Sequence, residues 1–181
     1  MKKTLTLLLI MTLAFILASC GASTITGEPA TFENKDGSVS IDIPAENEKS
    51  WIINEETSGD ILDITDKADT INVVLQCVSK TQMTPVAKDL LEYEEYVTAN
   101  TFAAYFDDIN PKTTHIDPPE YMKLYNAYTY TGPDTEGLIA FMESDKCYYT
   151  YIVRTVEDGY STNKKVLNDS LFSIKELTAV K

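Results

Sequence analysis

The alternation of apolar and polar residues predicts several β-strands in the first half of the chain. In residues 38–43, Val39, Ile41 and Ile43 fall on one face, and Pro44 ends the strand because proline cannot donate a ladder hydrogen bond. The strand predicted over residues 71–79 is apolar on both faces, so we expect it at the centre of a sheet. The further strand patterns cover residues 51–53, 60–65 and 71–79.

The periodicity changes after residue 83. Thr84 followed by Pro85 is typical of a helix start, and apolar residues then recur every three or four positions, which predicts a helix over residues 85–106. Prolines indicate a loop over residues 107–119. Tight turns then separate three strand patterns, which favours an antiparallel meander, and a final apolar periodicity predicts an amphipathic helix. These last elements cover residues 121–130, 137–142, 147–156 and 166–174.

The order of elements is therefore strands, a long helix, a meander and a terminal helix. Strands that are apolar on both faces need a covering layer on each side, which two helices and the early hairpin can supply. We expect an α+β fold in which an antiparallel β-sheet is sandwiched by helices, within a single domain over residues 32–177.

Residues 1–20 have the pattern of an export signal. A positively charged start precedes residues 4–19, which carry no charge and are too few for a comfortable bilayer span. The stretch ends in Leu17-Ala18-Ser19-Cys20, which resembles the lipobox of bacterial lipoproteins. The resemblance implies that Cys20 receives a diacylglyceryl thioether and becomes the new N-terminus. A plain secretory leader that happens to contain a cysteine is the alternative.

These features predict both the boundaries and the location of the protein. We expect a lipoprotein signal peptide over residues 1–19, a lipidated cysteine with a flexible tether over residues 20–31, and the folded domain after them. Two acyl chains anchor a protein stably. We therefore expect it at the extracytoplasmic face of the cell membrane, with the membrane as a partner through the N-terminal lipid.

The charge of the chain narrows the classes of partner. Lys and Arg number 15 against 28 Asp and Glu, for a formal net charge of −13. Affinity for nucleic acid comes mostly from Lys and Arg that neutralise phosphates, so no nucleic-acid partner is expected. The acidic surface favours a basic or cationic partner over an anionic one.

A family resemblance rests on the order of several segments. Asp36–Pro44 combines a turn, a strand and a proline; Trp51 follows it; and Tyr148–Ile152 and Val166–Phe172 form a tyrosine-bearing strand and a terminal helix. In this order they resemble the PsbP-like family, named for an extrinsic lumenal protein of photosystem II, over about residues 31–175. The resemblance implies an α/β/α sandwich. Many bacterial relatives are small lipoproteins without known activity, which agrees with the lipobox, whereas no residue here marks the photosynthetic role.

Cys77 and Cys147 are the thiols left after the lipobox, and both lie on predicted strands. In an exported domain they could form a disulfide that would stabilise the fold by about 4 kcal/mol in the loop-entropy model. The favoured alternative is two buried free thiols, because cysteine packs as a small hydrophobe. The spacing of two cysteines does not decide between these alternatives.

Tyrosine is abundant, with 11 residues, and many fall on the predicted meander. One interpretation is cross-strand aromatic packing that stabilises the sheet. The other is an aromatic recognition face, because tyrosine combines a large contact area with a polar tip. Strand alternation divides the tyrosines between two faces, which favours packing for at least some of them. The recognition face would comprise Tyr121, Tyr125, Tyr149 and Tyr151.

Two further patterns suggest a metal site and an acid–base pair, but neither meets the requirements of such a site. Asp60, Asp63, Asp66 and Asp69 recur every third residue, but this spacing alternates faces on a strand, so no calcium site or other metal site is expected. His115, the single histidine, precedes Asp117 by two residues, but the sequence shows neither a nucleophile nor an oxyanion hole to accompany this pair. We therefore expect neither catalysis nor a cofactor.

The sequence thus predicts a membrane-anchored extracytoplasmic lipoprotein that is not an enzyme. Its leading function is that of an interaction or accessory module, with an extracytoplasmic protein complex or a cell-wall component as partner. The alternative is a ligand-binding lipoprotein for a small molecule or a cell-wall fragment, which would show a concave pocket instead of a flat face.

Overall fold

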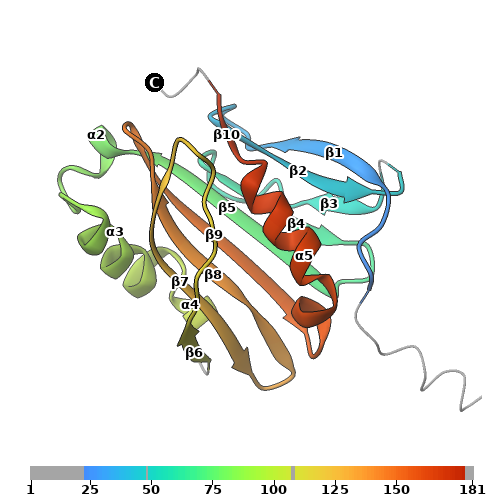
Figure 1. Cartoon of the computed structure of the whole chain (residues 1–181). Helices are drawn as coiled ribbons and strands as arrows, with labels where there is room; N and C mark the ends of the chain where they lie inside the picture. Colours follow the sequence, from blue (N-terminus) through green and yellow to red (C-terminus); the bar gives the residue numbers. More distant parts are fainter. Residues whose placement is uncertain (1–22, 48, 107–108, 178–181) are drawn as a thin grey trace, which may run out of the picture.

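Two antiparallel sheets form the framework of the structure (Figure 1). The computed structural model describes residues 23–47, 49–106 and 109–177. Within these residues the larger sheet has the strand order β3-β4-β5-β9-β8-β7-β6, and the smaller has the order β1-β2-β10. In chain order the strands are β1 (Glu28–Glu33), β2 (Val39–Ala45), β3 (Trp51–Ile53), β4 (Ile61–Asp66), β5 (Ile71–Ser79), β6 (Asn110–Thr113), β7 (Lys123–Gly132), β8 (Thr135–Glu143), β9 (Cys147–Val156) and β10 (Lys175–Glu176).

Helices lie on both faces of the larger sheet (Figure 1). α5 and the smaller sheet cover one face, and the short helices between β5 and β6 cover part of the other. The helices are α2 (Lys80–Met83), α3 (Leu90–Tyr96), the π-helical turn η1 (Val97–Thr101), α4 (Ala103–Phe106) and α5 (Gly159–Phe172). The architecture is an α+β fold with an antiparallel sheet between two layers, as the sequence predicts.

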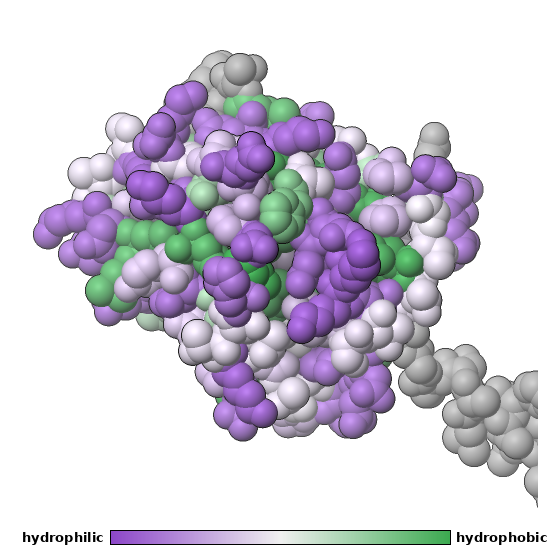
Figure 2. All heavy atoms as spheres, viewed as in Figure 1, coloured by the Kyte–Doolittle hydropathy of each residue, from purple (hydrophilic) through white to green (hydrophobic). Residues whose placement is uncertain are grey.

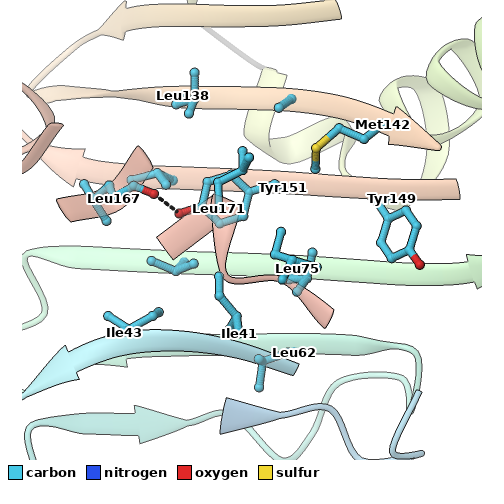
Figure 3. Packing of buried hydrophobic residues seen from close by; sticks show 14 of the residues in the cluster. Ile41, Ile43, Leu62, Leu75, Leu138, Met142, Tyr149, Tyr151, Leu167 and Leu171 are labelled. Atoms are coloured by element: carbon cyan, nitrogen blue, oxygen red, sulfur yellow. Dashed lines mark hydrogen bonds between the residues drawn. The ribbon is translucent and has the colours of Figure 1, made fainter. Parts of the chain in front are cut away.

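The face beneath α5 and β2 holds the larger apolar core (Figure 3). Ile41 of β2, Leu75 of β5 and Leu138 of β8 are fully buried there. Tyr151 of β9 lies beneath α5, and its hydroxyl donates a hydrogen bond to the carbonyl oxygen of Leu167 at 3.0 Å. The phenol thus fills apolar space while its polar tip keeps a partner, which avoids the cost of burying an unsatisfied hydroxyl.

The opposite face holds a second core under α3. The rings of Tyr93 and Tyr148 stack there with centroids 4.8 Å apart. The Tyr93 hydroxyl donates to Gln76 Oε1 at 3.1 Å and lies 2.8 Å from Thr150 Oγ1. The helical cover ends along β9, because Ile152 is fully buried whereas Arg154, on the same face, is exposed. One end of this face is therefore open.

The helix predicted over residues 85–106 is shorter and broken. α3 begins at Leu90 because Asp89 is its N-cap, with Asp89 Oδ1 accepting a hydrogen bond from the Glu92 amide at 2.9 Å. Thr84 instead ends α2, where its amide bonds to the Lys80 carbonyl. After α3 the chain widens into η1 before α4. The prediction placed the start too early because Thr84-Pro85 and Asp89 satisfy the same capping rule.

Two segments predicted to lie outside the sheets are strands. Residues 28–31, assigned above to a flexible tether, belong to β1, which pairs with β2 along its whole length. Residues 110–113, within the predicted loop, form the edge strand β6, where Pro111 is tolerated because one side of an edge strand needs no donor. The strands predicted at 71–79 and 147–156 are confirmed with the same bounds.

The outer surface around α5 is mainly hydrophilic, with apolar residues in small patches (Figure 2). Charged side chains of α5 itself contribute to this surface, including the ion pair between Lys165 and Asp169. Among the described residues, no helix combines the length and the hydrophobicity that crossing a membrane requires.

Candidate functional site

The principal candidate site is a cleft of about 530 Å³ at the open end of the larger sheet. Its walls come from the turns of the β4–β5 and β7–β8 hairpins, and its floor from the adjacent strands β5 and β9. We call it the Arg154 cleft. The charged and amide side chains that line it are Asn54, Asp63, Asp69, Asn72, Asp134 and Arg154.

Strand register brings the floor of the Arg154 cleft together. Asn72 of β5 lies opposite Thr65 of β4 on one side and opposite Arg154 of β9 on the other. Arg154 in turn lies opposite Gly137 of β8. Residues directly opposite in antiparallel strands project to the same face. Three polar side chains from three strands therefore form one row, which ends at Gly137, where the Tyr130 ring lies over the strand.

Hydrogen bonds hold part of this row in place. The Asn72 amide nitrogen donates to Asp63 Oδ1 at 2.7 Å and to Thr65 Oγ1 at 3.0 Å. Asn54 Nδ2 donates to the other carboxylate oxygen of Asp63 at 3.1 Å. Both oxygens of Asp63 thus accept hydrogen bonds from neighbouring amides, so this carboxylate organises the floor of the cleft.

The other charges of the cleft have no such partners. Arg154, Asp69 and Asp134 are exposed, and within the described part of the chain their charged groups make no hydrogen bond or ion pair. Asp69 and Asp134 occupy the two hairpin turns with φ of 58° and 54°, a left-handed conformation that Asp tolerates better than most residues. The cleft therefore presents one cationic and two anionic groups to a ligand.

A second cavity, of about 350 Å³, lies between the start of the domain and the β2–β3 connection. Trp51 borders it, but the indole is nearly buried and its Nε1 donates to the Pro44 carbonyl oxygen at 3.0 Å. The charged residues that line it are Glu46, Lys49, Asp66 and Lys67. The tryptophan is thus committed to packing, and this cavity offers a less organised set of groups than the Arg154 cleft.

The start of the domain is fastened to the body of the fold. The Ile25 amide donates to Asn163 Oδ1 of α5 at 2.7 Å, and Asn163 Nδ2 donates to the Ser23 carbonyl oxygen at 2.7 Å. The Ser23 amide also donates to Thr70 Oγ1 at 3.3 Å, beside the Arg154 cleft. Residues 23–27 therefore make ordered contacts although they fall within the predicted tether. Cys20 itself lies outside the described residues.

The aromatic recognition face is wrong as proposed from the sequence. Tyr149 and Tyr151 are fully buried beneath β10 and α5, so neither can contact a partner. Tyr121 and Tyr125 are exposed by 45% and 43%, but the Tyr121 hydroxyl is occupied by a hydrogen bond to the Ile174 carbonyl oxygen at 2.9 Å. The tyrosines of the meander are mainly core residues, as the alternative interpretation held.

Cys77 and Cys147 are free thiols that lie against each other in the core. They come from adjacent strands, since Cys77 lies opposite Tyr149 and Cys147 opposite Ser79. The hydrogen bond with Cys147, together with burial, raises the pKa of the Cys77 thiol. Between the two sequence alternatives, the structure corresponds to buried free thiols, brought close enough to contact by the β5–β9 pairing.

The aspartate series and the histidine do not build a reactive site. Asp60 accepts a hydrogen bond from Gln76 Nε2 at 2.7 Å, and Asp66 accepts backbone hydrogen bonds within its own hairpin turn. His115 Nε2 lies 3.4 Å from Asp117 Oδ1, with the two side chains 83% and 77% exposed. The described residues contain no group of three His, Cys, Asp or Glu placed to hold a metal ion.

Sequence reasoning did not connect the residues of the Arg154 cleft with one another. Arg154 is the only arginine of the chain and follows a run of apolar and aromatic residues in β9. That exception to the strand pattern was a usable signal. Asp63 and Asp69 were noticed only as members of the aspartate series, and Asp134 had no signal because it is an ordinary turn residue.

Comparison with solved structures identifies the fold as the PsbP-like α+β fold. The chain is similar to the solution structure of cyanobacterial PsbP (CyanoP) from Synechocystis sp. PCC 6803, with a TM-score of 0.52 and 12% identity, over 87% of this chain and 97% of that chain. A crystal structure from Bacteroides thetaiotaomicron VPI-5482 matches with a TM-score of 0.47 and 10% identity, over 87% of this chain and 51% of that one. No family model and no curated protein matches the sequence. The resemblance inferred from the sequence is confirmed at the level of the fold.

Proposed function

We propose that the protein is a lipid-anchored extracytoplasmic lipoprotein, held to the cell membrane through Cys20, and that its PsbP-like domain is a non-catalytic interaction or accessory module. The segment Leu17-Ala18-Ser19-Cys20 at the end of an uncharged stretch carries the proposal, because its residues and position suit lipidation. No catalytic step is included, since the His115 and Asp117 side chains are 83% and 77% exposed and the sequence around them carries no nucleophile signal.

The contacts of the first described residues support a short anchor. Ser23 bonds to Thr70 and Asn163, so three peptide links separate Cys20 from a fixed point of the domain. Such a segment spans at most about 11 Å. A lipid on Cys20 would therefore hold the domain close to the membrane, where its partner would be a membrane-associated or cell-wall component.

Metabolic labelling tests the anchor. Cells would express the full chain with a C-terminal tag, grow with an alkyne fatty acid, and be separated into membrane and soluble fractions. We expect the wild type and Cys147→Ser, the control that keeps Cys20, to be labelled and recovered with membranes. Cys20→Ser should be unlabelled and soluble. Equal labelling of Cys20→Ser, or an unlabelled wild type, would refute lipidation at this residue.

Cross-linking in intact cells tests the accessory role. The tagged wild type and Cys20→Ala would be cross-linked, purified and analysed by mass spectrometry. We expect one extracytoplasmic protein to be enriched with the anchored form in preference to the unanchored form. If neither form captures a protein above the level of an untagged strain, the interaction module is refuted.

The Arg154 cleft favours a second function, binding of a small ligand by the anchored domain. Its volume of about 530 Å³ falls within the range of small-molecule sites, roughly 300–1,000 Å³. Its floor is organised by hydrogen bonds around Asp63, while the exposed residues Arg154, Asp69 and Asp134 line the cleft. A concave site with convergent polar groups is the feature that separates this function from a flat interaction surface.

A further inference from the structure

The charges of the Arg154 cleft restrict the ligand more than its volume does. Within the described residues, one guanidinium and two carboxylates there lack a partner, those of Arg154, Asp69 and Asp134. The Asp63 carboxylate is already engaged by Asn54 and Asn72. A ligand that displaces water from this cleft must supply opposite charges, because desolvated charges without counter-charges are costly.

Simple classes of ligand fail this requirement. A neutral sugar would leave all three charges without a counter-ion. An anion would pair with Arg154 but face the carboxylates of both hairpin turns, and a diamine would pair with those carboxylates but face the guanidinium. The net charge of −13 further disfavours anions around the whole molecule. The matching set of charges is one carboxylate and two ammonium groups.

We propose that the Arg154 cleft binds an amino acid with one carboxylate and two amino groups, the class to which lysine and ornithine belong. This inference rests on the ligand-binding function proposed above and names its ligand class. The ligand carboxylate pairs with the Arg154 guanidinium, whose planar fork suits two parallel hydrogen bonds to a carboxylate. The two ammonium groups pair with Asp69 and Asp134.

The positions of the three residues suit this division of roles. Arg154 rises from the floor of the cleft, on the strand next to β5. On its β8 side it lies opposite Gly137, over which the Tyr130 ring lies. Asp69 and Asp134 lie on separate hairpins at the rim. The cationic group is therefore central and the anionic groups are peripheral, so an elongated ligand with amino groups at different positions can reach both hairpins.

The test is titration of the full chain, purified in a mild detergent, by isothermal calorimetry with four probes. L-Lysine carries all three groups, norleucine lacks the side-chain amine, 6-aminohexanoate lacks the α-amine, and cadaverine lacks the carboxylate. Saturable binding should be tightest for L-lysine and weaker by about threefold or more for each truncated probe, because exposed ion pairs contribute modestly. Equal affinity for L-lysine and cadaverine, or no saturable binding of L-lysine, would overturn the proposal.

Substitutions test which residue of the cleft pairs with each charged group of the ligand. Arg154→Gln should weaken L-lysine about tenfold and strengthen cadaverine, because the variant loses the ligand carboxylate's partner and the positive charge that repels a diamine. Asp69→Asn and Asp134→Asn, which keep a side chain suited to a positive φ, should each weaken L-lysine severalfold. Lys112→Gln on the edge strand β6 is the matched control and should bind as the wild type does. Unchanged L-lysine affinity in Arg154→Gln, with an unaltered melting temperature, would refute the assignment. Lipid labelling at Cys20 is read separately, so failure of the anchor and failure of the ligand class are distinguishable.

Discussion

Gly137 of β8 provides a sharp test of the packing around the cleft, through substitution by alanine. A Cβ at this position would lie 1.9 Å from the Val153 carbonyl oxygen and 2.7 Å from the Tyr130 hydroxyl oxygen. The Tyr130 ring crosses the glycine so that its hydroxyl can donate to the same carbonyl at 2.9 Å. Both nearest groups are buried, and one of them is backbone.

The size of the effect follows from these two contacts. Since a backbone carbonyl cannot rotate away, β8 or β9 must shift, and such overpacking costs about 1–3 kcal/mol. Displacing Tyr130 also removes a buried hydrogen bond, which contributes about 1 kcal/mol. We therefore expect Gly137→Ala to lower the free energy of unfolding by about 3 kcal/mol, or the melting temperature by roughly 6–12 °C for a domain of this size.

The assay is urea denaturation followed by circular dichroism, with Gly59→Ala as the matched control. A Cβ at Gly59 meets nothing closer than 3.5 Å, so that variant should stay within about 0.5 kcal/mol of the wild type. Tyr130→Phe alone should cost about 1 kcal/mol, and less in the Gly137→Ala background, where the hydrogen bond is already broken. A Gly137→Ala protein as stable as Gly59→Ala would refute the close approach of β8 and β9.

Three other outcomes are expected. Tyr93→Phe removes a buried hydroxyl that bonds to Thr150 and should cost about 1–3 kcal/mol in the same denaturation assay. Cys77 and Cys147 are buried, so iodoacetamide at pH 8 should label them only after unfolding in guanidinium; equal labelling of the native protein would contradict their burial. Burial raises the pKa of Tyr160 to about 12. An unfolded tyrosine loses its proton near pH 10, so between these values the folded state holds more protons and stability falls as pH rises. Denaturation at pH 9 and pH 11 should show that fall, and a stability that rises with pH would contradict it.

The sheet was largely predictable because its central strands carry strong local signals. β5 and β9 are long, rich in β-branched and aromatic residues, and bounded by turns, so their limits agree with the sequence. β1 was missed because it is an edge strand with charged residues at both ends, and its pairing with β2 rather than its composition makes it a strand. The start of α3 was misplaced because two capping signals compete within six residues of one another, Thr84 and Asp89.

The candidate site was less predictable, for a different physical reason. Alternation along β9 correctly separates Tyr149 and Tyr151 from the residues on the other face. It does not show where the covering layers end, and that decides whether a side chain is buried or exposed. Tyr151 is enclosed by α5, whereas Arg154 lies beyond the reach of α3. Both facts depend on contacts between segments far apart in the sequence.

Thr70 connects the proposed anchor with the proposed ligand site. Its hydroxyl oxygen accepts the Ser23 amide at 3.3 Å and donates to Asp66 Oδ2 at 3.1 Å, while the preceding residue, Asp69, forms the rim of the Arg154 cleft. If Cys20 carries the lipid, the cleft therefore lies near the membrane-proximal end of the domain. A Thr70→Val variant should keep lipid labelling and lose the hydrogen bond from the Ser23 amide, while the Asn163 side chain still donates to the Ser23 carbonyl oxygen. We expect faster hydrogen exchange at the Ser23 amide, which donates to Thr70, and unchanged exchange at Ile25, whose amide donates to Asn163, and in the core of β5. Equal exchange of the Ser23 amide in the wild type and in Thr70→Val would show that Thr70 does not connect the anchor with the cleft.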